Sequence, residues 1–229
     1  MLVNTLLYLI LGFLDIIVVI AFIFKLFRFP FWDYKREVII IGLSLAITSF
    51  LVRIIFEIPE IDLAIQFFLF IVFFRYLIKF RVAEAAMLTA IGILAFDLSQ
   101  LLVIPSLITL EVASLGDVFR STGMGTFLIQ AVNDGVMILV SWILFRFNLG
   151  FSFIMQPPHE VRWKTSYKGT NFVALIGVLI ASVAIFATLY ILLNYFNEIK
   201  YVAITVIVAF IILLITSHKK EMEDLEGYD

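Results

Sequence analysis

Three carboxylates interrupt long apolar stretches of the sequence: Asp15, Asp97 and Asp134. An ionised side chain in a membrane-spanning helix costs about 2.5 to 3.5 kcal/mol on insertion scales, so such groups usually face protein or a watery cavity. There they can bind a ligand, coordinate a cation or carry protons. They can also satisfy one another and hold helices together. The residue types alone leave both interpretations open.

Each carboxylate lies on a polar stripe with helical spacing. The stripes are Asn4, Tyr8 and Asp15; Thr89, Ile93, Asp97 and Gln100; and Gln130, Asn133, Asp134, Met137 and Ser141. Residues three or four apart share one face of a helix, so we expect the three helices to turn these faces towards one another.

A polar cavity that opens to the outside is the functional hypothesis for these faces. Arg53 lies near the outer end of its apolar run, where its side chain can pair with Asp97 or Asp134, or snorkel to the surface. The candidate ligand-binding or coupling residues are Asp15, Arg53, Asp97, Gln100, Gln130, Asn133 and Asp134.

The apolar runs that carry these residues have the length of membrane spans, since about 20 residues cross a bilayer. We expect seven spans, with six as the alternative, at residues 5–24, 38–56, 63–80, 85–107, 127–145, 172–195 and 201–217. The first is expected to be a retained helix, because no small-residue cleavage site follows it. The predicted fold is all-α, a polytopic integral membrane helix bundle. It forms one transmembrane domain, residues 1–217, followed by a short charged tail, residues 218–229.

Composition supports this fold class and excludes several functions. The 229 residues are 63% hydrophobic and 15% charged, with a mean hydropathy of +1.13. Soluble domains are about half apolar and a quarter charged. A net charge of −2 argues against nucleic-acid binding through a basic surface, and the lack of cysteine excludes disulfides and thiolate sites.

Catalytic and metal motifs are not found in the sequence. The two histidines, His159 and His218, are far apart and on the predicted cytoplasmic side, which does not make a convincing metal site. No HExxH motif occurs, and no GxSxG-type serine accompanies an intramembrane histidine. We therefore expect no enzymatic activity, no metal and no cofactor.

Orientation follows from the positions of lysine and arginine, which accumulate in short cytoplasmic loops. All but three of the 16 basic residues fall on one side of the predicted bundle, the exceptions being Arg53, Arg120 and Lys200. This places the N-terminus outside and the C-terminus inside. The sequence thus predicts a multi-pass protein of the cell membrane, with the lipid bilayer as its surroundings.

Two outer loops differ in character. The turn 57–62 is short, acidic and external, whereas the segment 106–124 is the longest outer connection and carries Glu111, Asp117 and Arg120 among apolar residues. Such a segment can lie along the membrane surface or cap a pocket.

Three stretches, all within residues 1 to 110, resemble the N-terminal membrane sensor region of Agr-like histidine kinases of the GHKL class. They are Phe24-Lys25-Leu26-Phe27-Arg28-Phe29-Pro30, Arg53 with the turn Glu57-Ile58-Pro59, and Phe74-Arg75-Tyr76-Leu77. The resemblance implies six or seven helices, with an inner C-terminus that feeds a dimerisation helix and an ATP-binding kinase domain. These 229 residues contain no ATP-binding boxes, so the expected protein is an excised sensor portion or a stand-alone relative that signals through a partner.

The functional expectation is a non-catalytic membrane sensor. It would bind an extracellular ligand, such as a small peptide, and signal to a histidine kinase or another cytoplasmic partner. The alternative is a small transporter, or a transporter membrane subunit, in which Asp15, Asp97 and Asp134 couple to protons or a cation. A third interpretation gives the polar groups a purely structural role in an assembly protein.

Overall fold

The computed structural model describes residues 2–157, 176–185 and 199–226, and these residues are helical over most of their length. The long helices and one short one are α1 (Leu2–Leu26), α2 (Lys35–Phe50), α3 (Asp62–Phe73), α4 (Val82–Thr109), α5 (Leu115–Phe119), α6 (Met124–Arg146) and α8 (Ile199–Glu226). Single turns adjoin them at η1 (Phe31–Tyr34), η2 (Leu51–Ile55), η3 (Pro59–Ile61) and η4 (Phe74–Ile78). A further helical segment occupies Ile176–Ile185.

Six helical stretches in the described part of the chain are long and apolar enough to cross a membrane. They are Val3–Leu26, Phe31–Ile55, Pro59–Ile78, Val82–Thr109, Met124–Arg146 and Ala203–Glu223. They match six of the predicted spans and confirm the all-helical, multi-pass membrane fold. The other predicted span, 172–195, lies mostly outside the described residues, apart from Ile176–Ile185. In the tail expected from residue 218, helix α8 continues to Glu226.

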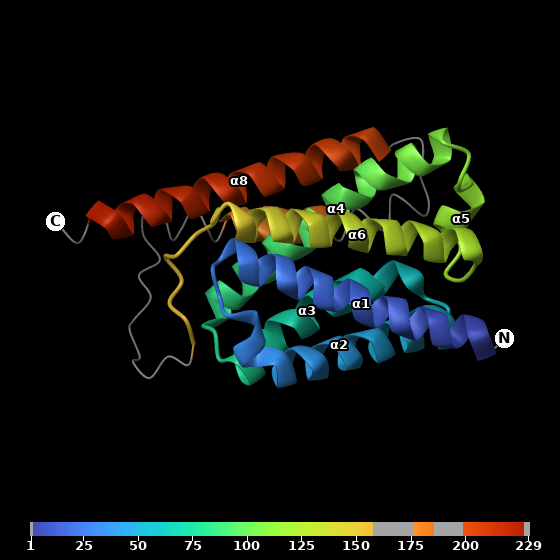
Figure 1. The fold of residues 1–229 in the computed structure, drawn as a ribbon, viewed down its shortest axis with the longest axis horizontal. Helices are drawn as coiled ribbons and strands as arrows, with labels where there is room; N and C mark the ends of the chain where they lie inside the picture. The colour runs from blue at the N-terminus through green and yellow to red at the C-terminus, as the bar shows by residue number, and fades with distance from the viewer. Residues whose placement is uncertain (1, 158–175, 186–198, 227–229) are drawn as a thin grey trace.

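From α1 to α6 the chain alternates between the two ends of the bundle (Figure 1). Helix α6 finishes at the end opposite to the one where α8 begins. The helical segment Ile176–Ile185 lies between them in sequence. Its residues Ala181, Ala184 and Ile185 are buried in the main hydrophobic core.

One end of the bundle holds most of the described basic residues, and we call it the basic end. Its members are Lys25, Arg28, Lys35, Arg36, Arg75, Lys79, Arg81, Arg146, Lys219 and Lys220. The start of α1 lies at the opposite end (Figure 1).

Left-handed residues end several of the helices. Arg28, Glu111 and Asn148 each have a positive φ. The backbone N–H of the next residue donates to the carbonyl oxygen five positions earlier, which is the hydrogen bond of a Schellman cap. At Arg28 this bond runs from Phe29 N to Phe24 O, at 2.7 Å. The caps satisfy carbonyl groups that would otherwise be exposed to an apolar surrounding.

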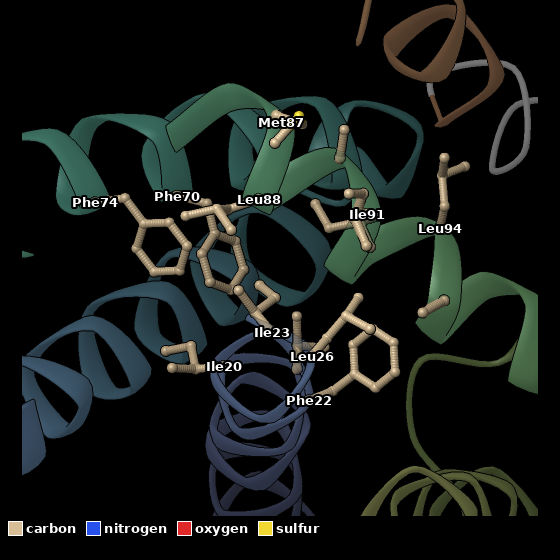
Figure 2. Close-up of a cluster of buried hydrophobic side chains, with 14 of the residues drawn as sticks. Ile20, Phe22, Ile23, Leu26, Phe70, Phe74, Met87, Leu88, Ile91 and Leu94 are labelled. Carbon is tan, nitrogen blue, oxygen red and sulfur yellow. The ribbon is translucent and has the colours of Figure 1, made fainter. Parts of the chain in front are cut away.

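Helix α1 is the central element, because it packs against α2, α4 and α6. Figure 2 shows its apolar face meeting residues of α3, η4 and α4 in a dense cluster. Helices α1 and α4 approach closely where α4 has a glycine. A Cβ at Gly92 would lie 2.4 Å from Ile23 Cδ1, so the glycine makes room for Ile23. Close packing of this kind holds membrane helices together in the absence of a hydrophobic driving force.

Helices α2 and α3 each finish in a π turn that carries an arginine, Arg53 in η2 and Arg75 in η4. In η2 the wider turn is closed by Phe56 N bonding to Leu51 O at 2.8 Å. Single π turns often occur at functional sites because they redirect side chains. In η2 the side chain that is placed in this way is Arg53.

The loop after α6 fastens the basic end. Phe151 N donates to Leu26 O, at the end of α1, at 2.7 Å. Glu221 of α8 accepts hydrogen bonds from Ser152 N at 2.6 Å, Ser152 Oγ at 2.6 Å and Phe153 N at 2.9 Å. The loop therefore connects the C-terminal end of α1 with the last turns of α8, and we call this set of contacts the basic-end clasp.

Candidate functional site

A cavity of about 200 Å³ lies at the end of the bundle opposite the basic end. Its walls are supplied by helices α1, α2, α3, α4 and α6, and the short helix α5 adds further lining residues. Its charged lining residues are Asp15, Arg53, Asp62, Asp97, Asp117 and Arg120. Apolar side chains such as Ile16, Phe70 and Phe96 complete the walls. A concave site with a few convergent polar groups is the usual form of a small-molecule site.

Arg53 and Asp62 form an ion pair on one side of the cavity, with Nε and Oδ2 3.9 Å apart. Asp62 is only 3% exposed and accepts further bonds, from Ser49 Oγ at 2.8 Å and from Gln66 Nε2 at 3.2 Å. Because Ser49 gives its hydrogen to Asp62, Tyr8 donates its hydroxyl to Ser49 at 2.9 Å. This network joins α1, α2 and α3.

The ion pair corrects one sequence-based expectation. The sequence allows Arg53 to pair with Asp97 or Asp134 or to snorkel to the surface, but its ion-pair partner is Asp62, which the sequence placed in the external acidic turn. The physical reason is that α3 begins at Asp62 itself. Its carboxylate therefore lies inside the bundle, beside the π turn that carries Arg53.

Asp97 of α4 lines the cavity and is 6% exposed. None of the described residues donates a hydrogen bond to its Oδ2 atom. Burial of a carboxylate without a partner is costly, and such groups are rare in folded proteins. Gln100, three residues further along α4, also lines the cavity. The unpartnered Asp97 is the strongest single sign of a binding site in the described part of the chain.

Asp15 and Gln130 meet where α1 packs on α6, and both line the cavity. Gln130 Nε2 donates to Asp15 Oδ2 at 3.2 Å. The other oxygens of this pair, Asp15 Oδ1 and Gln130 Oε1, have no donor among the described residues. The carboxyl group of Asp134 faces Asp15 from the next turn of α6 and also lacks a donor. Oxygen acceptors therefore outnumber donors at this contact.

Five of the seven predicted site residues lie on the cavity wall: Asp15, Arg53, Asp97, Gln100 and Gln130. The other two, Asn133 and Asp134, are buried on α6 outside this lining. Asn133 Oδ1 accepts a hydrogen bond from Ser99 of α4. Asn133 thus links α4 to α6.

The segment 106–124 contributes α5 to the cavity wall, which corresponds to the second of the two roles expected for it. Ser114 donates to Asp117 Oδ2 from its backbone N at 2.9 Å and from its hydroxyl at 2.6 Å. These hydrogen bonds from Ser114 hold the pKa of the Asp117 carboxyl below its usual value. Thr126 of α6 donates its hydroxyl to Asp117 O at 2.8 Å and so fastens α5 to the start of α6.

Seven polar lining residues were missed as site candidates: Tyr8, Ser49, Asp62, Gln66, Asp117, Arg120 and Thr126. The sequence spacing could have indicated two pairs of these lining residues. Ser49 precedes Arg53 by four positions and Asp62 precedes Gln66 by four, so each pair shares a helix face. In the described ranges, no group of three or more His, Cys, Asp or Glu residues is placed to hold a metal ion. His159 lies outside these ranges, and His218 lies on α8.

No protein family matches the chain, and no curated protein or solved structure resembles it at a significant level. What the chain does must therefore be inferred from the cavity and the side chains around it.

Proposed function

We propose that this chain is a non-catalytic membrane sensor that binds a small extracellular ligand in the cavity and signals to a cytoplasmic partner. The observation that carries the proposal is the buried, unpartnered Asp97 on the cavity wall. A ligand that supplies its missing partner would bind one helix arrangement better than another, which is the condition for a shift between states.

The sidedness of the cavity supports an extracellular ligand. Short loops rich in lysine and arginine remain in the cytoplasm, so the basic end is the inner one. Because the cavity lies at the opposite end, its ligand would arrive from outside the cell. The volume of about 200 Å³ would take a small molecule, or one terminus or side chain of a peptide.

A route from the cavity to the inner side is available through α1. Its residues Tyr8, Gly12 and Asp15 line the cavity, and its last carbonyl group, at Leu26, bonds to the loop held by Glu221. A shift of α1 would thus reach α8 through the basic-end clasp. The last turns of α8 are then the surface that a cytoplasmic histidine kinase or other partner would contact.

The apolar interior beyond the cavity favours a binding site over a transport path. From Ile20 to Phe24, α1 carries only apolar side chains, and most of them are buried. Figure 2 shows several of them packed against α3, η4 and α4. A ligand held above such a cluster has no polar path to the basic end through this part of the bundle.

The test of the sensor proposal is affinity purification of the tagged chain from gently solubilised native membranes, followed by identification of any stoichiometric partner. We expect a histidine kinase or a response regulator. An Asp97→Asn variant should retain that partner but lose the response to extracellular medium. Recovery of an ATPase, or of this chain alone, would contradict the sensor proposal.

A second candidate, a proton- or cation-coupled transporter, is favoured by one observation. The contact between α1 and α6 gathers unpartnered oxygens from Asp15, Gln130 and Asp134, and carboxyl groups at this depth are typical of proton relays. Proton flux into proteoliposomes separates the two functions. Flux that disappears in Asp134→Asn but persists in Glu60→Gln, which removes an exposed carboxylate, would favour transport.

A further inference from the structure

Four residues of the cavity wall each have a buried polar atom that lacks a hydrogen-bond partner among the described residues. Three are oxygen acceptors: Asp15 Oδ1, Asp97 Oδ2 and Gln130 Oε1. The fourth is the Nε donor of Arg53, whose contact with Asp62 is an ion pair at 3.9 Å. Acceptors of this kind call for a ligand that donates hydrogen bonds.

The charges on the wall are unevenly matched. Asp62 has Arg53, Ser49 and Gln66 as partners, and Asp117 has Ser114 and the nearby charge of Arg120. Asp97 has no cation beside it in the described part of the chain. Asp15 faces another carboxyl, Asp134, and is within electrostatic reach of Arg53. A positive charge is therefore missing beside Asp97 on α4.

We infer that the ligand of this cavity carries an ammonium group, seated between Asp97 on one side and Asp15 with Gln130 on the other. The inference rests on the proposed function, because it names the class of ligand for the same cavity. An ammonium group donates hydrogen bonds and carries the positive charge that an unpartnered buried carboxylate attracts. Phe70 and Phe96 are also on the wall, and the face of an aromatic ring attracts a cation.

The size of the cavity limits the ligand. The volume of about 200 Å³ is below the roughly 300 to 1,000 Å³ that is usual for pockets of drug-sized ligands. This accommodates a short-chain amine, a small zwitterion whose carboxylate meets Arg53, or the amino terminus of a peptide. It excludes burial of a whole peptide.

Binding to the purified full chain in nanodiscs tests the inference. The probes are propylammonium, its neutral counterpart 1-propanol and sodium ion, each titrated at pH 7 with ionic strength held constant by potassium chloride. Heat of binding and unfolding temperature are the readouts. We expect saturable binding of propylammonium with a dissociation constant of about millimolar size, as suits so few atoms, and no saturable binding of 1-propanol.

Variants locate the charge that the probe needs. Asp97→Asn keeps the shape of the side chain and should weaken propylammonium binding at least tenfold, as should Asp15→Asn. Glu60→Gln removes an exposed carboxylate at the same end of the bundle and should leave binding unchanged. The contrast between propylammonium and 1-propanol is measured on the unmodified chain, so it holds even where a variant folds poorly.

The opposing outcomes are distinct. Equal binding of 1-propanol, no binding of propylammonium, or binding of sodium alone that Asp97→Asn abolishes would each overturn the ammonium ligand. Binding of propylammonium as expected, together with recovery of an ATPase in the affinity purification, would contradict the sensor proposal and retain the ligand class. Recovery of a kinase without ammonium binding would support the sensor proposal and contradict the ammonium ligand.

Discussion

Arg53 in the π turn η2 and Asp62 at the start of α3 form an ion pair across the connection between the second and third spans, with Nε and Oδ2 3.9 Å apart. The two side chains are unequally exposed, at 27% for Arg53 and 5% for Asp62. Asp62 also has Ser49 and Gln66 as hydrogen-bond donors. The pair therefore joins α2 to α3 beside the cavity.

Asp62→Asn should lower the free energy of unfolding by about 1 to 3 kcal/mol, because hydrogen bonds to a buried charge are lost and Arg53 keeps an uncompensated charge. Chemical unfolding in detergent measures the change. The matched control is a cycle with Arg53→Gln, in which the double variant should lose less than the sum of the single variants. Strict additivity would show that the two side chains do not interact.

Helical spacing was sufficient to predict that the polar faces of α1 and α6 meet. Asp15 and Gln130, which are 115 positions apart, lie on stripes that the 3.6-residue period defines, and the two side chains are hydrogen-bonded. The six long apolar helices could likewise be predicted, because about 20 apolar residues are needed to cross a bilayer.

The partner of Arg53 could not be predicted by the same reasoning. It depends on the π turn, which departs from the 3.6-residue period, and on α3 starting at Asp62 rather than one residue later. Neither feature has a periodic signal in the sequence. The contribution of α5 to the cavity wall depends on local caps, in which Ser114 and Asp117 bond to each other. The sequence alone therefore does not decide whether this segment lies along the membrane surface or caps a pocket.

Gly150→Ala should destabilise the basic-end clasp. Gly150 has a φ of +139°, and an added Cβ would lie 2.3 Å from the backbone oxygen of Leu26. Strained backbone positions of this kind cost about 1 to 3 kcal/mol each, and the clash adds to that cost. The unfolding temperature in detergent measures the loss.

The control for Gly150 is Gly135→Ala on α6, where an added Cβ meets nothing within 4 Å. That change should be neutral, or stabilising by up to about 1 kcal/mol, because alanine favours a helix more than glycine does. Equal effects of the two substitutions would contradict the role assigned to Gly150.

Glu221→Gln should loosen the loop after α6. The carboxylate accepts hydrogen bonds from both Ser152 and Phe153, whereas a neutral amide offers a single, weaker acceptor oxygen. A loss of about 1 to 2 kcal/mol of local stability should speed amide hydrogen exchange at these two residues about tenfold. Asp33→Asn, which alters an exposed carboxylate at the same end, should leave their exchange unchanged. Unaltered exchange in Glu221→Gln would remove the clasp as a link between α1 and α8.

The structure of α5 should depend on acid pH. The hydrogen bonds from Ser114 lower the pKa of Asp117 in the folded protein, so the ionised form is the one that caps α5. For a carboxyl group with a lowered pKa, the added stability is fully present above the unfolded pKa, which is about 4. It is lost as the pH falls through the folded value. Amide exchange at Ser114, corrected for the intrinsic effect of pH, should therefore lose protection as the pH is lowered from about 6 to 3.

Asp117→Asn separates this effect from general acid unfolding. The variant has no titratable group at the cap, so its Ser114 amide should show weak protection that does not change over the same pH range. Thr126 still holds α5 to α6 through the Asp117 backbone oxygen, which the substitution retains. The cavity should therefore keep its α5 wall in the variant, and propylammonium affinity at pH 7 should change far less than in Asp97→Asn. A pH dependence in the variant equal to that of the unmodified chain would assign the titration to another group.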